Sequence, residues 1–146
     1  MTTTDTTTSD TTTSDAPAGS DDVGTTTADA ERAIDTYLAA YGEPDAATRA
    51  RLVAEVFADD AVLADPPFLA RGHDELVGAF AAVQERFPGH RFERTSRVDV
   101  HHDVARCTWA LGAPDGEPAL VGTDVVAFRD GRIARVHGFF GDVTPR

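Results

Sequence analysis

The sequence predicts an α+β protein in which three N-terminal helices pack on one side of a curved, mostly antiparallel sheet. Two observations carry this prediction. Apolar residues recur at helical spacing from residue 29 to residue 87, interrupted by one short apolar strand, and they alternate with a period of two from His90 onward. Helices that precede a run of antiparallel strands are gathered on one side of the sheet that those strands form.

Three helices are expected, at residues 29–41, 46–57 and 72–87. Asp29 and Asp45 are the expected caps of the first two, because short acidic side chains accept hydrogen bonds from free backbone amides at helix starts. Glycine and proline follow each of the first and third helices and indicate where they end.

A short strand follows the second helix. Residues 61–64 are apolar without a break, which is typical of a strand covered on both faces, and Asp59 and Asp60 suit an exposed turn before it. Pro66 lacks an amide donor and ends the strand at Asp65, with residues 66–69 in a loop. Asp65 is either an ordinary turn residue in water or a buried acid with a raised pKa.

Four longer strands are expected after residue 90, with Asp-Gly turns between the later ones. The first is a long strand that contains Phe92, Val98 and Val100. The other three are expected at 105–111, 120–128 and 133–140.

The first part of the chain differs in composition from the rest. Residues 1–28 are a low-complexity segment of Thr, Asp, Ser and Gly, in which Val23 is almost the only large apolar residue. Such a segment cannot bury enough surface to offset its ordering entropy. We therefore expect a disordered tail at 1–28 and one domain at 29–146.

Charge and composition exclude several classes of function. The formal net charge of −12 disfavours nucleic acid and anionic membranes as partners, since both require clustered basic residues. Cys107 is the single cysteine, so an internal disulfide is excluded. Neither a secretory signal nor an apolar run of transmembrane length is present, and we expect a cytoplasmic protein.

The order of elements resembles the nuclear-transport-factor-2-like superfamily, a cone-shaped, cystatin-like fold that includes the SnoaL-like polyketide cyclases. The resemblance covers residues 29 to about 143, and it is carried by the segments 37–41, 57–66 and 128–141 and by Gly72. It implies a cone that holds a small apolar ligand without a cofactor. Members of one fold carry out different chemistry, so the site must be argued separately.

The site positions are most similar to those of the ketosteroid isomerases. That family's tyrosine on the first helix falls on Tyr37, its catalytic aspartate on Asp65, and its second aspartate on Asp124. The resemblance implies that Asp65 is the base for an α-proton, and that Tyr37 and a protonated Asp124 donate to the enolate oxygen. One departure is that the family's supporting tyrosine on the third helix falls on Phe80.

The residues around Asp124 agree with a neutral acid. Gly122, Val126 and Phe128 share its strand face, and such neighbours raise a carboxyl pKa by desolvation. An exposed acid at a strand irregularity is the alternative, and Tyr37 is alternatively a core aromatic. The expected substrate pocket consists of Phe68, Phe80, Trp109, Val126, Val136, Gly138 and Phe140.

A limonene-type epoxide hydrolase is a further hypothesis, because Arg97 and Asp99 resemble the Arg-x-Asp of that family, which shares this fold. Its second aspartate falls on Gly138, however. By strand alternation Arg97 and Asp99 point away from Val98 and are expected on a solvated face.

The histidines are also candidates for metal ligands or acid–base groups. His101 and His102 suggest a metal site, but no third ligand is evident, so no metal is expected. His137 is either an interface residue or an acid–base group.

A different class of function also remains open, a non-catalytic module of this fold that binds a ligand or only dimerises. Val121, Thr123, Val125 and Ala127 form an apolar face opposite Asp124, and Ile133 and Phe139 are expected to extend it. We therefore expect a homodimer joined through the sheet.

Overall fold

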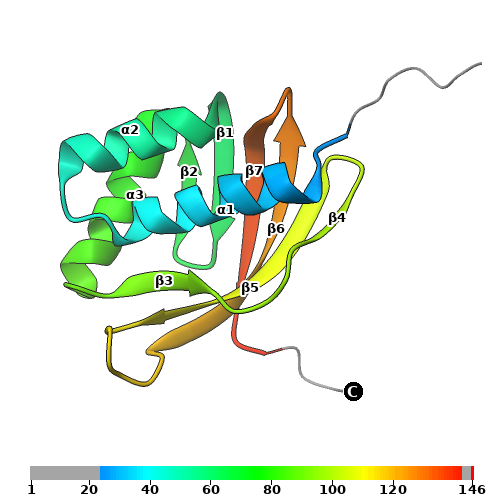
Figure 1. Ribbon diagram of the computed structural model, residues 1–146. Helices are drawn as coiled ribbons and strands as arrows, with labels where there is room; N and C mark the ends of the chain where they lie inside the picture. Colours follow the sequence, from blue (N-terminus) through cyan, green and yellow to red (C-terminus); the bar gives the residue numbers. More distant parts are fainter. Residues whose placement is uncertain (1–23, 143–145) are drawn as a thin grey trace, which may run out of the picture.

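The computed structural model describes residues 24–142 and residue 146, and it contains three helices and one seven-stranded sheet (Figure 1). The helices are α1 (Thr27–Gly42), α2 (Ala46–Val56) and α3 (Gly72–Arg86). The strands are β1 (Phe57–Asp65), β2 (Phe68–Arg71), β3 (Arg91–Arg94), β4 (Asp99–His101), β5 (Val104–Gly112), β6 (Leu120–Arg129) and β7 (Arg132–Phe140). The predicted α+β architecture is confirmed.

The sheet has the strand order β2-β1-β7-β6-β5-β3, and β4 also pairs with β5. All pairs are antiparallel except β1 with β7, which run parallel. Figure 1 shows α1 crossing in front of the sheet, with α2 and α3 to one side near β1 and β2. The parallel pair brings the end of β1 beside β7, and the side chain of Asp65 lies on the face that α1 covers, where Tyr41 of α1 donates a hydrogen bond to it.

The first helix begins earlier than predicted. Its cap is Thr26, whose hydroxyl oxygen accepts a 3.1 Å hydrogen bond from the amide of Asp29, so Asp29 lies in the first turn instead. Thr25 also donates its amide to Asp103 Oδ1 at 3.2 Å. The folded part therefore includes residues 24–28, and residues 1–23 of the predicted tail lie outside the described residues. The predicted cap at Asp45 is confirmed.

Two local predictions around the first strand are corrected. β1 starts at Phe57, and Asp59 and Asp60 lie within it as a bulge, where the register with β7 shifts between Phe57 and Val62. The expected loop at 66–69 is a tight hairpin, because Phe68 pairs with Asp65 and opens β2. Only the two prolines remain as the turn.

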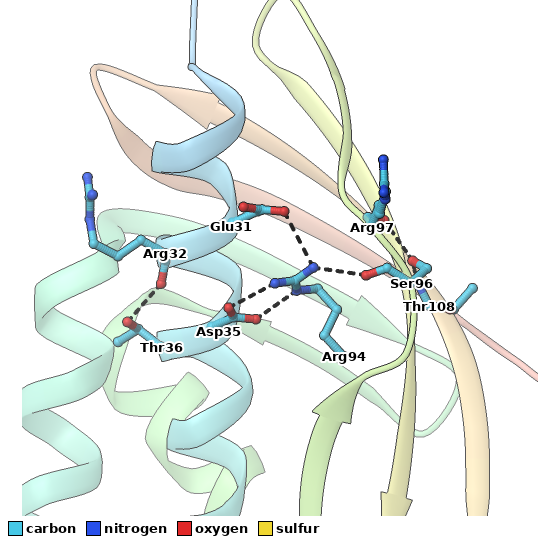
Figure 2. A network of polar contacts seen from close by, with 8 residues as sticks. All are labelled: Glu31, Arg32, Asp35, Thr36, Arg94, Ser96, Arg97 and Thr108. Atoms are coloured by element: carbon cyan, nitrogen blue, oxygen red, sulfur yellow. Dashed lines mark hydrogen bonds and ion pairs between the residues drawn. The ribbon is translucent and has the colours of Figure 1, made fainter.

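The long strand expected after residue 90 is broken into β3 and β4. Both pair with β5, and between them the amide of Thr95 still donates to the carbonyl of Thr108 at 2.8 Å. Figure 2 shows how Arg94 fixes the break against α1. Its guanidinium binds both oxygens of Asp35 at 2.8 and 3.1 Å and donates to the carbonyl of Ser96 at 2.9 Å. A bidentate arginine pair of this kind fixes geometry as well as charge.

A bulge also changes the expected faces of β7. Phe128 pairs with Ile133, but Ala127 pairs with Arg135, so one residue is inserted between them. Ile133 consequently points into the core and is 0% exposed, whereas Phe139 is 59% exposed on the outer face. The expectation that Ile133 extends the outer apolar face is therefore wrong, because strict alternation fails at a bulge.

The main core lies between the helices and the inner face of the sheet. Its largest fully buried side chains include Tyr37, Phe57 and Phe80, whose rings pack against one another. Within residues 24–142, no helix combines the length and the apolar character that crossing a membrane requires.

Candidate active site

An apolar cavity of about 460 Å³ opens between α1, α3 and the inner face of the sheet. Its lining residues are Tyr37, Tyr41, Asp65, Pro67, Phe68, Ala82, Val83, Arg86, Phe87, Phe92, Trp109, Leu111, Leu120 and Phe140. Among these lining residues, Asp65 is the one acidic side chain and Arg86 the one positively charged side chain. Two larger hollows, of about 620 and 630 Å³, lie elsewhere on the surface and have mostly polar linings, so they do not offer the same apolar enclosure.

A buried polar cluster centred on Asp124 lies behind Tyr37 and Trp109, two residues that line this cavity, and Asp124 itself is not part of the lining. The carboxyl of Asp124 is 1% exposed and accepts two hydrogen bonds. The Tyr37 hydroxyl donates to Oδ2 at 2.9 Å, and the indole Nε1 of Trp109 donates to Oδ1 at 2.8 Å. Burial raises the pKa of Asp124 to about 7, although both hydrogen bonds act in the opposite direction.

A glycine in β6 makes room for the Trp109 donor. Gly122 is the cross-strand partner of Trp109, and a Cβ added to it would lie 2.3 Å from the indole ring. Because that side chain is absent, the indole lies against β6, and its Nε1 reaches Asp124 two residues further along the same face. Trp109 was predicted only as a pocket residue. The glycine two positions before Asp124 in a strand is the signal in the sequence that could have indicated its role as a donor.

Asp65 is held differently, by one partner. The Tyr41 hydroxyl donates to its Oδ2 at 2.8 Å, while Oδ1 is buried and has no hydrogen-bond partner among the described residues. Burial raises the pKa of Asp65, and the bond from Tyr41 opposes that shift. A buried carboxylate oxygen without a partner costs free energy in the folded protein, so it indicates a group available for a ligand.

The two acids meet at a second glycine. A Cβ on Gly138 would lie 2.0 Å from Asp65 Oδ1 and 3.2 Å from Asp124 Oδ1. β7 thus presents an open backbone between the carboxyl groups, and the negative charge of Asp65 contributes to the raised pKa of Asp124.

The structure brings the three predicted catalytic residues, Tyr37, Asp65 and Asp124, to one place. Both tyrosines remain protonated donors, since burial, with the nearby acids, raises the pKa of Tyr37 and of Tyr41 well above the usual value. Tyr41 was not among the predicted site residues, although it lies one helical turn after Tyr37 and therefore on the same face of α1. Together these groups offer a base and hydroxyl donors at the end of an apolar cavity.

The predicted pocket residues divide into two sets. Phe68, Trp109 and Phe140 line the cavity. Phe80, Val126 and Val136 do not, because each is 0% exposed and belongs to the core beneath it. Phe80 packs against the ring of Tyr41 with their centroids 3.8 Å apart. Gly138 is also outside the lining and instead separates the two acids.

The rival constellations lie elsewhere. Arg97 and Asp99 are exposed, as predicted for a solvated strand face, and Asp99 pairs with Arg106 at 3.0 Å. His101 and His102 are exposed at a turn, and His137 is exposed on the outer face of β7.

No metal or thiol chemistry is indicated in the part of the chain that the structure describes. His, Cys, Asp and Glu side chains there form no group of three or more suited to a metal ion. Cys107 is a buried core residue, and burial raises the pKa of its thiol to about 12.

The chain is similar in sequence and in structure to known proteins of one family. Residues 25–136 match the family described as the SnoaL-like domain. A candidate isomerase of the SnoaL-like family from Agrobacterium tumefaciens is 34% identical, with a TM-score of 0.74 over 79% of this chain and 99% of that one.

More distant structures share the fold. A candidate polyketide cyclase from Sinorhizobium meliloti is 23% identical, with a TM-score of 0.60 over 78% of this chain and 99% of that one. A candidate ketosteroid isomerase from Kribbella flavida is 17% identical, with a TM-score of 0.59 over 82% of each chain. No curated protein matches the chain.

Proposed function

Because the chain belongs to the SnoaL-like domain family, we propose that it is an enzyme that moves a proton within a small, largely apolar carbonyl compound without a cofactor. The reaction class is that of an isomerase, as in the Agrobacterium relative's description, or of a SnoaL-like cyclase. The observation that carries the proposal is the buried Oδ1 of Asp65, which lines the apolar cavity and has no hydrogen-bond partner within the described part of the chain.

Asp65 acts as the base in this proposal. Its Oδ1 takes a proton from the carbon next to the carbonyl group, the electron pair of that C–H bond forms the enolate, and the proton returns to another carbon in the next step. A carboxylate acts best as a general base near neutral pH when its pKa is raised toward that pH but it is still ionised. A pKa raised by burial and limited by one hydrogen bond fits that requirement.

Tyr37 and Asp124 stabilise the enolate oxygen. When Asp124 is ionised, it accepts the only proton of the Tyr37 hydroxyl, as the 2.9 Å contact indicates. Once Asp124 is protonated, it no longer requires that donor, and Tyr37 can turn its proton to the enolate oxygen. An oxyanion is stabilised most by donors that are already in position in a dry site.

The test is α-proton exchange of a cyclic ketone in D₂O, followed by NMR, together with isomerisation of 3-cyclohexenone followed by absorbance. Wild type should catalyse both, and Asp65→Asn should abolish both. Turnover that survives Asp65→Asn would remove this proposal.

A non-catalytic ligand carrier is the second candidate, and one observation favours it. Tyr37, Trp109 and Asp124 satisfy each other's hydrogen bonds, so the inner polar cluster is stable without a ligand. Binding of 2-naphthol distinguishes the two functions. A carrier binds it equally in wild type and Tyr37→Phe, whereas an oxyanion site loses affinity in the variant.

A further inference from the structure

We propose that Tyr41 is the positioning residue of this site: its hydroxyl fixes the carboxylate of Asp65 so that Oδ2 is held and Oδ1 is directed into the reactive position. This inference rests on the proposed function of Asp65 as the base. It assigns to the two tyrosines of α1 two separate acids, since Tyr37 donates to Asp124 and Tyr41 donates to Asp65.

The donor is rigidly placed. The ring of Tyr41 packs against Phe80 and Phe92, with centroid distances of 3.8 and 4.6 Å. Its backbone carbonyl accepts a 2.8 Å hydrogen bond from Nε2 of Gln84, which ties the end of α1 to α3. A side chain held by two aromatic contacts and a fixed backbone presents its hydroxyl at one position, as precise catalysis requires.

The carboxylate needs such a restraint. Asp65 is the last residue of β1, and the prolines that follow it contribute no amide donors that could hold its oxygens. The opposite wall at Gly138 is bare backbone and leaves room for the carboxyl group without binding it. Among the described residues, Tyr41 therefore provides the one hydrogen bond that makes the two oxygens of Asp65 different.

The same bond also favours the ionised form of Asp65. The titratable groups near Asp65 are Tyr37 and Tyr41 on α1 and Asp124 on β6, and Arg86 on α3 lines the same cavity. Burial raises the pKa of Asp65, and the Tyr41 hydrogen bond is the influence that lowers it. Removing the hydroxyl should therefore raise the pKa of Asp65 and leave its carboxyl group free to rotate.

Tyr41→Phe tests this, with Tyr37→Phe as the matched control on the same helix face. The pKa of Asp65 is followed by ¹³C NMR of the side-chain carboxyl, which requires no turnover. We expect Tyr41→Phe to raise this pKa and to move the acidic limb of the pH–rate profile to higher pH. At pH values below the acidic limb, the activity of Tyr41→Phe should be about 10–100-fold lower than that of wild type, which corresponds to the loss of one hydrogen bond to a charged group. Tyr37→Phe should instead move the alkaline limb of the pH–rate profile, which reflects the pKa of Asp124.

The outcomes separate this inference from the proposed function. An upward shift of the Asp65 pKa in Tyr41→Phe supports the role of Tyr41 even if wild type turns over no ketone, in which case only the enzyme proposal fails. An unchanged Asp65 pKa together with an unchanged acidic limb overturns the inference while leaving the base itself in place. Circular dichroism of both variants checks that the phenylalanine ring that replaces each tyrosine leaves the fold unchanged.

Discussion

The carboxyl group of Asp65 fills the space that a side chain on Gly138 would need, since a Cβ on Gly138 would lie 2.0 Å from Asp65 Oδ1. The two residues lie on neighbouring parallel strands, and Gly138 is also the cross-strand partner of Asp124. The absence of one methyl group on β7 is therefore what allows an acid at the end of β1 to approach the acid on β6.

Gly138→Ala should displace the Asp65 carboxyl group and remove most activity. A loss comparable to removal of a general base, about 10²–10⁴ in rate, is expected, with about 1–3 kcal/mol of destabilisation from overpacking. Ketone exchange and urea unfolding measure the two effects. Gly78→Ala is the control, because that glycine lies exposed in α3 and has no neighbouring atom within 4 Å of an added Cβ. Equal behaviour of the two variants would contradict the role of Gly138.

The pH dependence of turnover should be bell-shaped. Activity needs Asp65 ionised and Asp124 protonated, so it rises as Asp65 loses its proton and falls as Asp124 loses its own, with the alkaline limb near the Asp124 pKa of about 7. Asp124→Asn should remove the alkaline limb, because the amide does not titrate. A pH–rate profile of both proteins between pH 4 and 9 decides this, and an alkaline limb that persists in the variant would assign it to another group.

Asp124 should also make the protein less stable as the pH rises. Its pKa is about 7 in the folded protein against a usual value of 3.8, so the folded state binds the proton more tightly than the unfolded state. This contribution is fully present below pH 3.8 and is lost as the pH approaches 7, with a slope of at most about 1.4 kcal/mol per pH unit. Urea unfolding of wild type and Asp124→Asn at several pH values measures it. Parallel stability curves for the two proteins would argue against a buried, protonated Asp124.

Two N-terminal deletions should differ. Deletion of residues 1–23 should leave the melting temperature unchanged, since the composition of this segment offers almost no apolar surface to bury. Deletion of residues 1–28 removes the Thr26 cap and the contact of Thr25 with Asp103, and it should cost about 1 kcal/mol or more. Thr26→Ala in the full chain isolates the cap. Identical melting curves for both deletions would show that the cap contributes nothing.

The outer face of β6 and β7 should join two copies of the chain. Val121, Val125 and Ala127 are half-buried there, and Phe139 is 59% exposed, which is unusual for a large aromatic side chain left in water. Sedimentation should show a homodimer that Phe139→Asp dissociates. Leu69→Asp, at an equally exposed residue on β2 at the edge of the sheet, should leave the assembly unchanged. A wild-type monomer at micromolar concentration would contradict the prediction.

The fold and the position of Asp65 were predictable because they depend on local signals. The change of period near residue 90 indicates where helices give way to strands, and Pro66 indicates where β1 ends. The hydrogen bond from Tyr41 to Asp65 depends on how α1 lies across the sheet, which no spacing in the sequence specifies. The bulges near Asp59 and Ile133 likewise depend on pairing with distant strands, so strict alternation assigned one residue to the wrong face.

The parallel contact between β1 and β7 has a consequence for the order of folding. Leu63 pairs with Val136, and Asp65 reaches its place only when Gly138 lies beside it, so residues half the chain apart in sequence must meet before the acids do. Contacts of such large sequence separation are slow to form, because the loop between them must first be closed against its entropy. The hairpins of β5, β6 and β7 should therefore appear first in a kinetic refolding experiment, and the carboxyl pair should be among the last features to acquire its native environment.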